Sequence, residues 1–159
     1  MKILKSLQVL HGSCNPTCIT TRCRKHRCVL LLPRQGTLCV ECDGCGAFPT
    51  QGTKPDFILL YAETNSSPAC WFVVEMKGRV HHPRAIVRQL QTGADAIQND
   101  HHFKVPQSPT ILVPIVLHEG HIHAADFDIL KSVSYLGKSC FIRTKRCGIA
   151  IDSLVSALE

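Results

Sequence analysis

The chain has 159 residues, of which 45% are hydrophobic and 19% are charged. This composition suits one folded domain with a buried core, and it excludes a disordered, collagen-like or coiled-coil chain. No run of about 18 apolar residues occurs, so we expect no transmembrane helix and no membrane partner. A lysine interrupts the short apolar stretch at the start and no small-residue cleavage site follows, which argues against a secretory signal. We therefore expect an intracellular protein, cytoplasmic or nucleoid-associated.

The positive charge is concentrated in the first third of the chain. The net charge is +6, and residues 1–54 account for all of it, with eight Lys and Arg against two acids. Seven of the ten cysteines also lie there, between Cys14 and Cys45. A basic, cysteine-rich front on a neutral body predicts an acidic polymer as partner. We therefore divide the chain into a basic, zinc-binding segment, residues 1–50, and a core, residues 51–159.

Short elements are predicted in the first 50 residues, where hydrophobic periodicity is weak. Ile3–Leu10 forms one short element, and the apolar runs Cys28–Leu32 and Thr37–Val40 form two more. Between them we expect an irregular segment that is organised by metal rather than by a hydrophobic core.

The core has stronger signals. Phe57–Tyr61 and Cys70–Val74 are β-forming runs on either side of a polar segment, which predicts a hairpin. Residues 81–99 repeat apolar residues every three or four positions, which predicts a helix, and Pro83 suits its first turn. Thr110–Leu117 predicts a further strand.

The remaining elements complete the expected fold. Pro114 within the last of these strands indicates an edge position or a bulge. Ser139–Arg143 and Gly148–Ile151 predict a terminal hairpin, and Asp152 is expected to cap a short helix at Ser153–Leu158. The order of hairpin, helix and strand implies an α/β fold, a mixed sheet flanked by helices.

Two acids and a lysine stand at the ends of the predicted hairpin strands. Asp56 begins the first strand, and Glu75 and Lys77 end the second. Residues two apart on a strand point the same way, so Glu75 and Lys77 share a face while Met76 points to the other. Asp56 on the neighbouring strand can reach that face. Two converging carboxylates suit a hard divalent cation, and a lysine beside them suits charge stabilisation during hydrolysis.

With Pro55-Asp56 and Glu75-Met76-Lys77 as its two motif halves, the chain resembles the PD-(D/E)XK nuclease superfamily over roughly residues 55–117. The resemblance implies a restriction-endonuclease-like fold. It implies that Asp56 and Glu75 bind Mg²⁺ or Mn²⁺ with the backbone carbonyl of Met76, and that Lys77 is catalytic. It also favours DNA as the substrate and a homodimer as the assembly.

The chain departs from the family pattern in two places. Many members add a glutamate on an upstream helix, but the only acids before Asp56 are Glu41 and Asp43, and neither lies in a predicted helix. Several members carry a glutamine on the helix after the lysine, with a tyrosine four residues on. Gln89 and Gln91 lie on this helix without that tyrosine, so the exonuclease version of the motif is absent. Both glutamines otherwise suit a solvated helix face.

Cysteine spacing predicts a structural zinc. Cys42 and Cys45 form a knuckle-like pair, and Cys23 and Cys28 are the preferred second pair for a tetrahedral site. An iron–sulfur cluster is the metal alternative. Buried thiols or disulfides are the alternatives without metal. The candidates held in reserve as ligands are Cys14, Cys18, Cys39 and His26. We expect Cys70, Cys140 and Cys147 to be core or surface thiols.

Basic residues around these cysteines predict a phosphate-binding loop, made of Arg22, Arg24, Lys25 and Arg27. A merely solvated basic loop is the alternative for these four. Arg84 and Arg88 lie one helical turn apart and can add phosphate contacts, although a role in solubility explains these two equally well. The histidines of residues 118–123 follow a strand and suit a polar loop better than a metal site, because their spacing is not that of the metalloprotease helix motif.

The sequence therefore predicts a metal-dependent nuclease, a DNA endonuclease by resemblance, with a zinc-bound basic segment that grips the substrate. Two alternatives remain open. One is a non-catalytic, zinc-containing nucleic-acid-binding protein with a degenerate nuclease fold. The other is a metalloenzyme of another class built from histidine and cysteine, to which Asp56 and Lys77 would not contribute.

Overall fold

The structure is a computed structural model that describes residues 19–20, 22–33, 36–48, 51–62, 69–106 and 108–156. The expected element at Ile3–Leu10, the reserve ligands Cys14 and Cys18, and most of the polar segment between the first two core strands lie outside the described residues. Among the helices of the described ranges, none has the length and apolar character needed to cross a bilayer.

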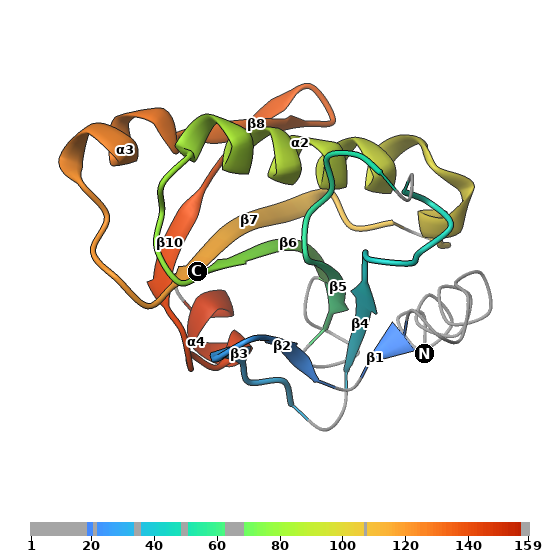
Figure 1. The fold of residues 1–159 in the computed structure, drawn as a ribbon. Coiled ribbons are helices and arrows are strands. Elements are labelled where there is room, and N and C mark those ends of the chain that lie inside the picture. The colour runs from blue at the N-terminus through green and yellow to red at the C-terminus, as the bar shows by residue number, and fades with distance from the viewer. Residues whose placement is uncertain are drawn as a thin grey trace.

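A six-stranded mixed sheet forms the centre of the molecule (Figure 1). Its strands, in spatial order, are β1 (Ile19–Thr20), β4 (Thr37–Glu41), β5 (Phe57–Tyr61), β6 (Cys70–Lys77), β7 (Ile111–His118) and β10 (Arg143–Arg146). Neighbours from β1 to β6 are antiparallel, while β6, β7 and β10 run parallel. The predicted α/β class and the predicted hairpin are thereby confirmed, and β6 extends three residues beyond the expected strand.

Helix α2 (Pro83–Asn99) makes the crossover between the parallel strands β6 and β7. Proline stands in its first turn, and one face is buried along its length through Ile86, Leu90, Ala94 and Ile97, as the periodicity predicts. Gly93 lies on the same face, where an added Cβ would stand 2.5 Å from Cγ1 of Val73. The helix therefore packs very closely on the sheet at this point.

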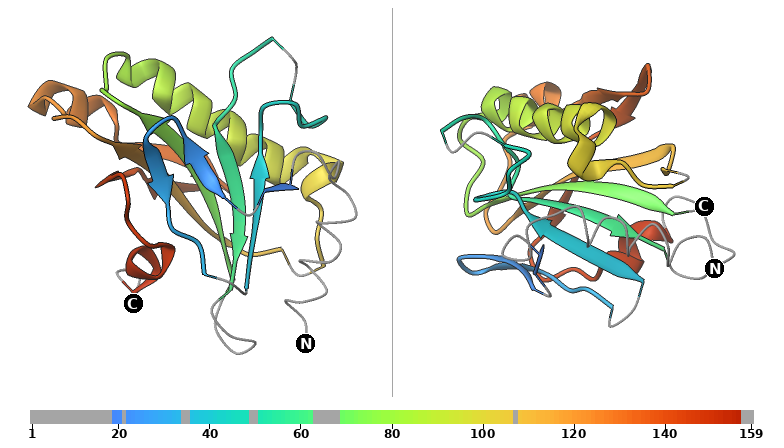
Figure 2. Two further views of the ribbon diagram at one scale, coloured as in Figure 1. Left: turned by 60° about the horizontal axis from the view of Figure 1, so that its bottom comes forward. Right: turned by 90° about the vertical axis from the view of Figure 1, so that its right-hand side faces the viewer.

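Apolar clusters line both faces of the sheet. On one face, side chains of α2 pack against Trp71 and Val73 of β6. On the other, Phe72 and Val74 pack against a hairpin of β2 (Cys23–Lys25) and β3 (Cys28–Leu30) and against α4 (Ile151–Val155). Figure 2 shows the resulting three layers, with α2 on one side of the sheet and the blue hairpin on the other.

The predicted division between residues 50 and 51 passes through one sheet. Strand β4 pairs with β5 over five residues, from Thr37 opposite Tyr61 to Glu41 opposite Phe57. Cys42, Cys45 and Phe48 are buried in the same cluster as α2. The described part of the cysteine-rich segment is therefore built into the core rather than attached to it.

The C-terminal third differs from expectation. Strand β9 (Lys138–Phe141) pairs with β8 (Ser132–Tyr135), so the predicted terminal hairpin is wrong. Strand β10 instead joins β7 in parallel, which is a long-range pairing that local patterns do not reveal. The short helices α3 (Ala124–Ile129) and η2 (His101–Phe103) complete the fold.

Two details of this region also correct the predictions. Strand β7 lies inside the sheet rather than at an edge. Pro114, which has no backbone N–H, precedes the stretch of β7 that pairs with β10, so β10 loses no hydrogen bond to it. Asp152 does not cap α4. Ala150 holds the cap position, and a carboxylate oxygen of Asp152 accepts a 2.8 Å hydrogen bond from the hydroxyl of Tyr61.

Candidate functional site

Asp56 and Glu75 meet at one end of the sheet. Phe57 pairs with Val74, so the next residues outward, Asp56 and Glu75, come to lie side by side. The amide of Asp56 donates a 3.1 Å hydrogen bond to Oε2 of Glu75, and the amide of Met76 donates a 2.8 Å bond to Oδ2 of Asp56. Each carboxylate is thus fixed by the strand that carries the other.

The backbone of Asp56 is held from both neighbouring strands. Its amide also reaches the carbonyl oxygen of Val74 at 3.1 Å, and its carbonyl accepts a 3.0 Å bond from the amide of Cys42. Cys42 begins a tight turn in which the amide of Cys45 donates to the Cys42 carbonyl at 3.2 Å. The cysteine knuckle therefore supports the position of Asp56, whether or not it binds metal.

Glu75 is a fully buried acid. Its side chain is 0% exposed, and burial, followed by the charge of Asp56, raises its pKa to about 7, against a smaller lowering by Lys77. Lys77 Nζ lies 2.6 Å from Oε1 of Glu75, and this oxygen accepts no further hydrogen bond among the described residues. As strand alternation predicts, these two side chains share a face, while Met76 packs in the opposite cluster with Phe72.

Lys25 reaches the same site from the β2–β3 hairpin. Its ammonium forms an ion pair with Oδ1 of Asp56, whose side chain is only 10% exposed. Burial lowers the pKa of Lys25, but the hydrogen bond to Asp56 and the charge of that carboxylate outweigh it, so the pKa is raised. The sequence predicted Lys25 as a phosphate ligand, whereas here it is the partner of a candidate metal ligand.

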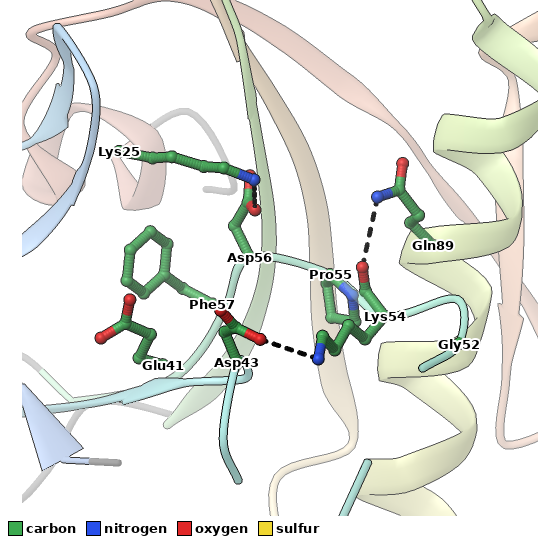
Figure 3. A pocket seen from close by; sticks show the side chains of 9 residues that line it. All are labelled: Lys25, Glu41, Asp43, Gly52, Lys54, Pro55, Asp56, Phe57 and Gln89. Atoms are coloured by element: carbon green, nitrogen blue, oxygen red, sulfur yellow. Dashed lines mark hydrogen bonds and ion pairs between the residues drawn. The ribbon is translucent and has the colours of Figure 1, made fainter. Parts of the chain in front are cut away.

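Two hollows adjoin this row of charges. The first, of about 280 Å³, is lined by Asp56 and by charged residues from β4 and the segment before β5 (Figure 3). The second, of about 330 Å³, is lined by Lys77, Met76, Arg27 and Glu119. Lys25 lines both hollows.

Both upstream acids lie in the first hollow. Glu41 ends β4 opposite Phe57, and Asp43 follows it in the turn (Figure 3). An ion pair of 2.9 Å with Lys54 lowers the pKa of Asp43, which is highly exposed. Neither acid forms a ligand cluster with Asp56 among the residues whose positions are described, so the part of the upstream glutamate stays a prediction for Glu41 or Asp43, or for neither.

The two glutamines of α2 have separate structural partners. Gln89 donates to the carbonyl of Lys54 at 3.3 Å and so braces the segment that leads to Asp56. Gln91 exchanges hydrogen bonds of 2.9 and 2.8 Å with the backbone of Ser134 and thereby ties α2 to β8. Neither side chain belongs to a merely solvated helix face.

The predicted zinc site of Cys23, Cys28, Cys42 and Cys45 does not form as expected. Cys28 is bonded to Cys147 in a disulfide with a Cα–Cα distance of 5.0 Å, so the prediction is wrong for Cys28 as a ligand and for Cys147 as a thiol. Across the described ranges, no three cysteines bring their sulfur atoms within 4.8 Å of one another.

Cys23 and Cys42 of this group are buried thiols with raised pKa values. Burial raises the pKa of Cys23, and a hydrogen bond with Cys39 raises it further. Burial likewise raises the pKa of Cys42 well above its ordinary value, and the charge of Cys45 adds to this. Cys39, one of the reserve ligands, thus interacts with both of these thiols.

The predicted phosphate-binding residues form two groups. Arg22, Arg24 and Arg27 are exposed on or beside the β2–β3 hairpin, and Arg27 also lines a third hollow of about 420 Å³ with Arg146 and His118. Arg84 and Arg88 are exposed on α2. Arg27 thus adjoins the candidate site through the second hollow, while no described contact ties Arg22, Arg24 or the two helix arginines to it.

The histidine-rich segment after β7 is a loop, as expected. Nδ1 of His118 lies 2.6 Å from the Gly120 carbonyl, and His121 and His123 are exposed. A separate cluster is formed by the consecutive residues Asp100, His101 and His102, whose ligand atoms lie within 4.8 Å of one another. The Asp100 carboxylate is engaged in capping η2 through the amide of His102 at 2.9 Å, which accounts for this cluster without a metal.

The residues at the sheet end fit a hard divalent cation. Asp56 and Glu75 offer carboxylate oxygens, and each of the two carboxylates already contacts a cationic ammonium through one oxygen. Oε1 of Glu75 is buried with that ammonium as its one described partner. This oxygen donor set is the type that Mg²⁺ and Mn²⁺ prefer.

Sequence reasoning did not find the roles of Lys25, Lys54 and Glu119 in this site. Lys25 is 31 positions from Asp56, and no local pattern links them. Glu119 joins the site because its amide donates to the Lys77 carbonyl at 3.3 Å across the β6–β7 pair.

Comparison with protein-family models, with curated proteins and with solved structures finds no match for this chain.

Proposed function

We propose that the protein is a metal-dependent nuclease that hydrolyses phosphodiester bonds, with DNA as the favoured substrate. One observation carries the proposal: Asp56 and Glu75 are locked together by hydrogen bonds from each other's strand, with Lys77 2.6 Å from Glu75. The order β5, β6, α2, β7, in which a hairpin is followed by a helix and a parallel strand, is also the order on which the resemblance to the PD-(D/E)XK superfamily rests.

The residues have distinct roles in this proposal. Asp56 and Glu75 hold the cation, and the Met76 backbone carbonyl is a further expected ligand. When bound, Mg²⁺ or Mn²⁺ supplies charge neutralisation at the phosphoryl oxygens and a lowered pKa for water. Lys77, anchored on Glu75 and partly exposed to the second hollow, places a positive charge where negative charge develops on phosphorus.

The overall reaction consumes one water molecule. Its oxygen forms a new bond to phosphorus, and the bond between phosphorus and the departing sugar oxygen breaks. One proton of the water ends on that departing oxygen, so that a hydroxyl group and a phosphate monoester are released. Arg27 lines the second hollow and is expected to hold the substrate backbone, and the exposed Arg22 and Arg24 of the same segment are expected to add to this contact.

Cleavage assays test the proposal. Plasmid, linear duplex, single-stranded and branched DNA, and RNA, are incubated with Mg²⁺, with Mn²⁺ and with EDTA. Wild type should cut at least one of these with metal only. Asp56→Asn and Lys77→Met should each lower the rate at least about 100-fold while nucleic-acid binding persists. Asp128→Asn, an exposed acid of α3, controls for loss of one negative charge and should cut like wild type.

A non-catalytic nucleic-acid-binding protein is the second candidate. The observation that favours it is the ion pair of Lys25 with Asp56, which satisfies the carboxylate without any metal. Wild type that binds nucleic acid but never cuts it with either metal would support this function. Cleavage that survives in both Asp56→Asn and Lys77→Met would contradict the proposed site.

A further inference from the structure

The four charged side chains of the site cancel one another. Lys25 pairs with Asp56, and Lys77 pairs with Glu75. A divalent cation added to this set leaves two positive charges in excess. The set therefore accepts such a cation most readily when one of the ammonium groups moves away.

Lys25 occupies the oxygen that a metal ion needs. Oδ2 of Asp56 accepts the 2.8 Å bond from the amide of Met76, which leaves Oδ1 as the outward-facing donor. The ammonium of Lys25 sits on Oδ1 (Figure 3). Lys77, in contrast, lies on Glu75 and leaves both oxygens of Asp56 untouched.

The chain holds Lys25 in this position from outside the sheet. Lys25 ends β2, next to the turn residue His26, which has a left-handed φ of 54°. The returning strand β3 is bonded to the C-terminal segment by the Cys28–Cys147 disulfide and by a 2.7 Å hydrogen bond from the amide of Gly148 to the Val29 carbonyl. A hairpin anchored in this way presents the ammonium at low entropic cost.

Lys25 is also the residue that the linings of the two hollows share. Asp56 lines only the first, Lys77 lines only the second, and Lys25 lines both. Its side chain is 41% exposed, so it can swing to solvent without unfolding the hairpin. Departure of Lys25 would uncover Oδ1 of Asp56.

From these contacts we propose that Lys25 is a built-in cation that competes with a divalent metal ion for Asp56. The inference rests on the proposed function, because it takes Asp56 as a metal ligand. It assigns the β2–β3 hairpin the role of a latch, which keeps the site in a metal-free, charge-neutral form until Lys25 leaves. Lys25 then regulates metal loading rather than serving only as a phosphate ligand.

Direct metal binding tests the proposal without any activity measurement. Unbound Mn²⁺ is counted by electron paramagnetic resonance at pH 8 for the full-length protein, with far-UV circular dichroism as the check of folding. Lys25→Met should lower the Mn²⁺ dissociation constant at least tenfold relative to wild type. Lys25→Arg keeps the charge and should stay within threefold of wild type. Arg27→Met removes a positive charge from the same hairpin and should also stay within threefold.

The outcomes separate the latch from the metal site itself. If Lys25→Met binds Mn²⁺ no more tightly than Arg27→Met does, while Asp56→Asn abolishes binding, the metal site stands and the latch is overturned. If Asp56→Asn binds Mn²⁺ as wild type does, or if folded Lys25→Met binds none, both the latch and the proposed metal site are overturned. Tighter binding by Lys25→Met that disappears in the Lys25→Met/Asp56→Asn double variant is the result that the proposal requires.

Discussion

The Asp56 amide donates a 3.1 Å hydrogen bond to Oε2 of Glu75, so a backbone group of one strand orients the carboxylate of its neighbour. The reverse contact, from the amide of Met76 to Oδ2 of Asp56, completes a reciprocal pair. Because backbone amides in a paired sheet move little, both carboxylates are positioned before any ligand arrives. This arrangement costs stability, since Glu75 is held in the interior beside another acid.

That cost predicts how stability depends on pH. The pKa of Glu75 is raised from 4.5 to about 7, so between these values the folded protein binds more protons than the unfolded chain does. The free energy of unfolding should therefore fall as pH rises through this window, by up to about 3 kcal/mol. Glu75→Gln lacks this titration, so its free energy of unfolding should rise relative to that of wild type from pH 5 to pH 8. Urea unfolding in EDTA measures both proteins.

A constant difference between wild type and Glu75→Gln across that pH range would contradict the raised pKa. Asp128→Asn provides the control, because it removes an exposed acid of α3 that lines neither hollow of the site. Its difference from wild type should change little with pH.

The disulfide between Cys28 and Cys147 predicts a redox-dependent stability. The two residues are 119 positions apart, so the bond closes a long loop and restricts the unfolded chain. Reduction of wild type with excess dithiothreitol should lower the free energy of unfolding by about 2–5 kcal/mol. The double variant Cys28→Ala/Cys147→Ala should be equally weakened and should not respond to the reductant. The same urea midpoint for wild type with and without dithiothreitol would refute the prediction.

Gly93 is predicted to tolerate no side chain. A Cβ there would lie 2.5 Å from Cγ1 of Val73 and 2.9 Å from Cγ of Pro55, which is the residue before Asp56. Gly93→Ala should destabilise the protein by about 1–2 kcal/mol, because overpacking outweighs the gain in helix propensity. The loss should shrink in a Val73→Ala background, where the clashing methyl groups are gone. Urea unfolding of wild type, Gly93→Ala, Val73→Ala and the double variant gives the free energy of unfolding of each protein. If the two substitutions change this free energy additively, the methyl groups of Val73 do not cause the loss.

Arg27 is predicted to contact a phosphate of bound nucleic acid, since it lines the hollow that contains Lys77. Arg27→Ala should weaken DNA binding uniformly across sequences and reduce the slope of log affinity against log salt by about 1. Fluorescence anisotropy over a series of salt concentrations measures that slope. Lys138→Ala removes an exposed charge from β9 and should leave the slope unchanged. Equal slopes for Arg27→Ala and wild type would show that Arg27 does not contact a phosphate of the bound DNA.

Local patterns predicted the centre of the fold well. The run Phe57–Tyr61 is strand β5 and residues 83–99 are helix α2, because alternation and helical periodicity act over a few residues. The same reasoning failed for the terminal hairpin, in which β9 pairs with β8 while β10 joins β7. Partner choice between short strands depends on which sheet edge lies open, and that is a property of the assembled fold.

The candidate site divides in the same way. Strand spacing alone placed Glu75 and Lys77 on one face and indicated Asp56 as their neighbour, because side chains alternate strictly along a strand. Spacing also suggested a zinc site that included Cys28, which the structure places in a disulfide with Cys147.

What the sequence by itself determined is the set of short-range relationships: the hairpin strands, the crossover helix, and two acids and a lysine at one end of a sheet. Only the tertiary structure decided that Lys25 covers Asp56 from 31 residues away and that Cys28 meets Cys147 across 119 positions. Contacts at such separations form because packing brings distant elements together. The periodicity of a single segment does not predict which other elements it will contact. The meeting of two acids and a lysine at the sheet end could therefore be anticipated, but the ion pair of Lys25 with Asp56 could not.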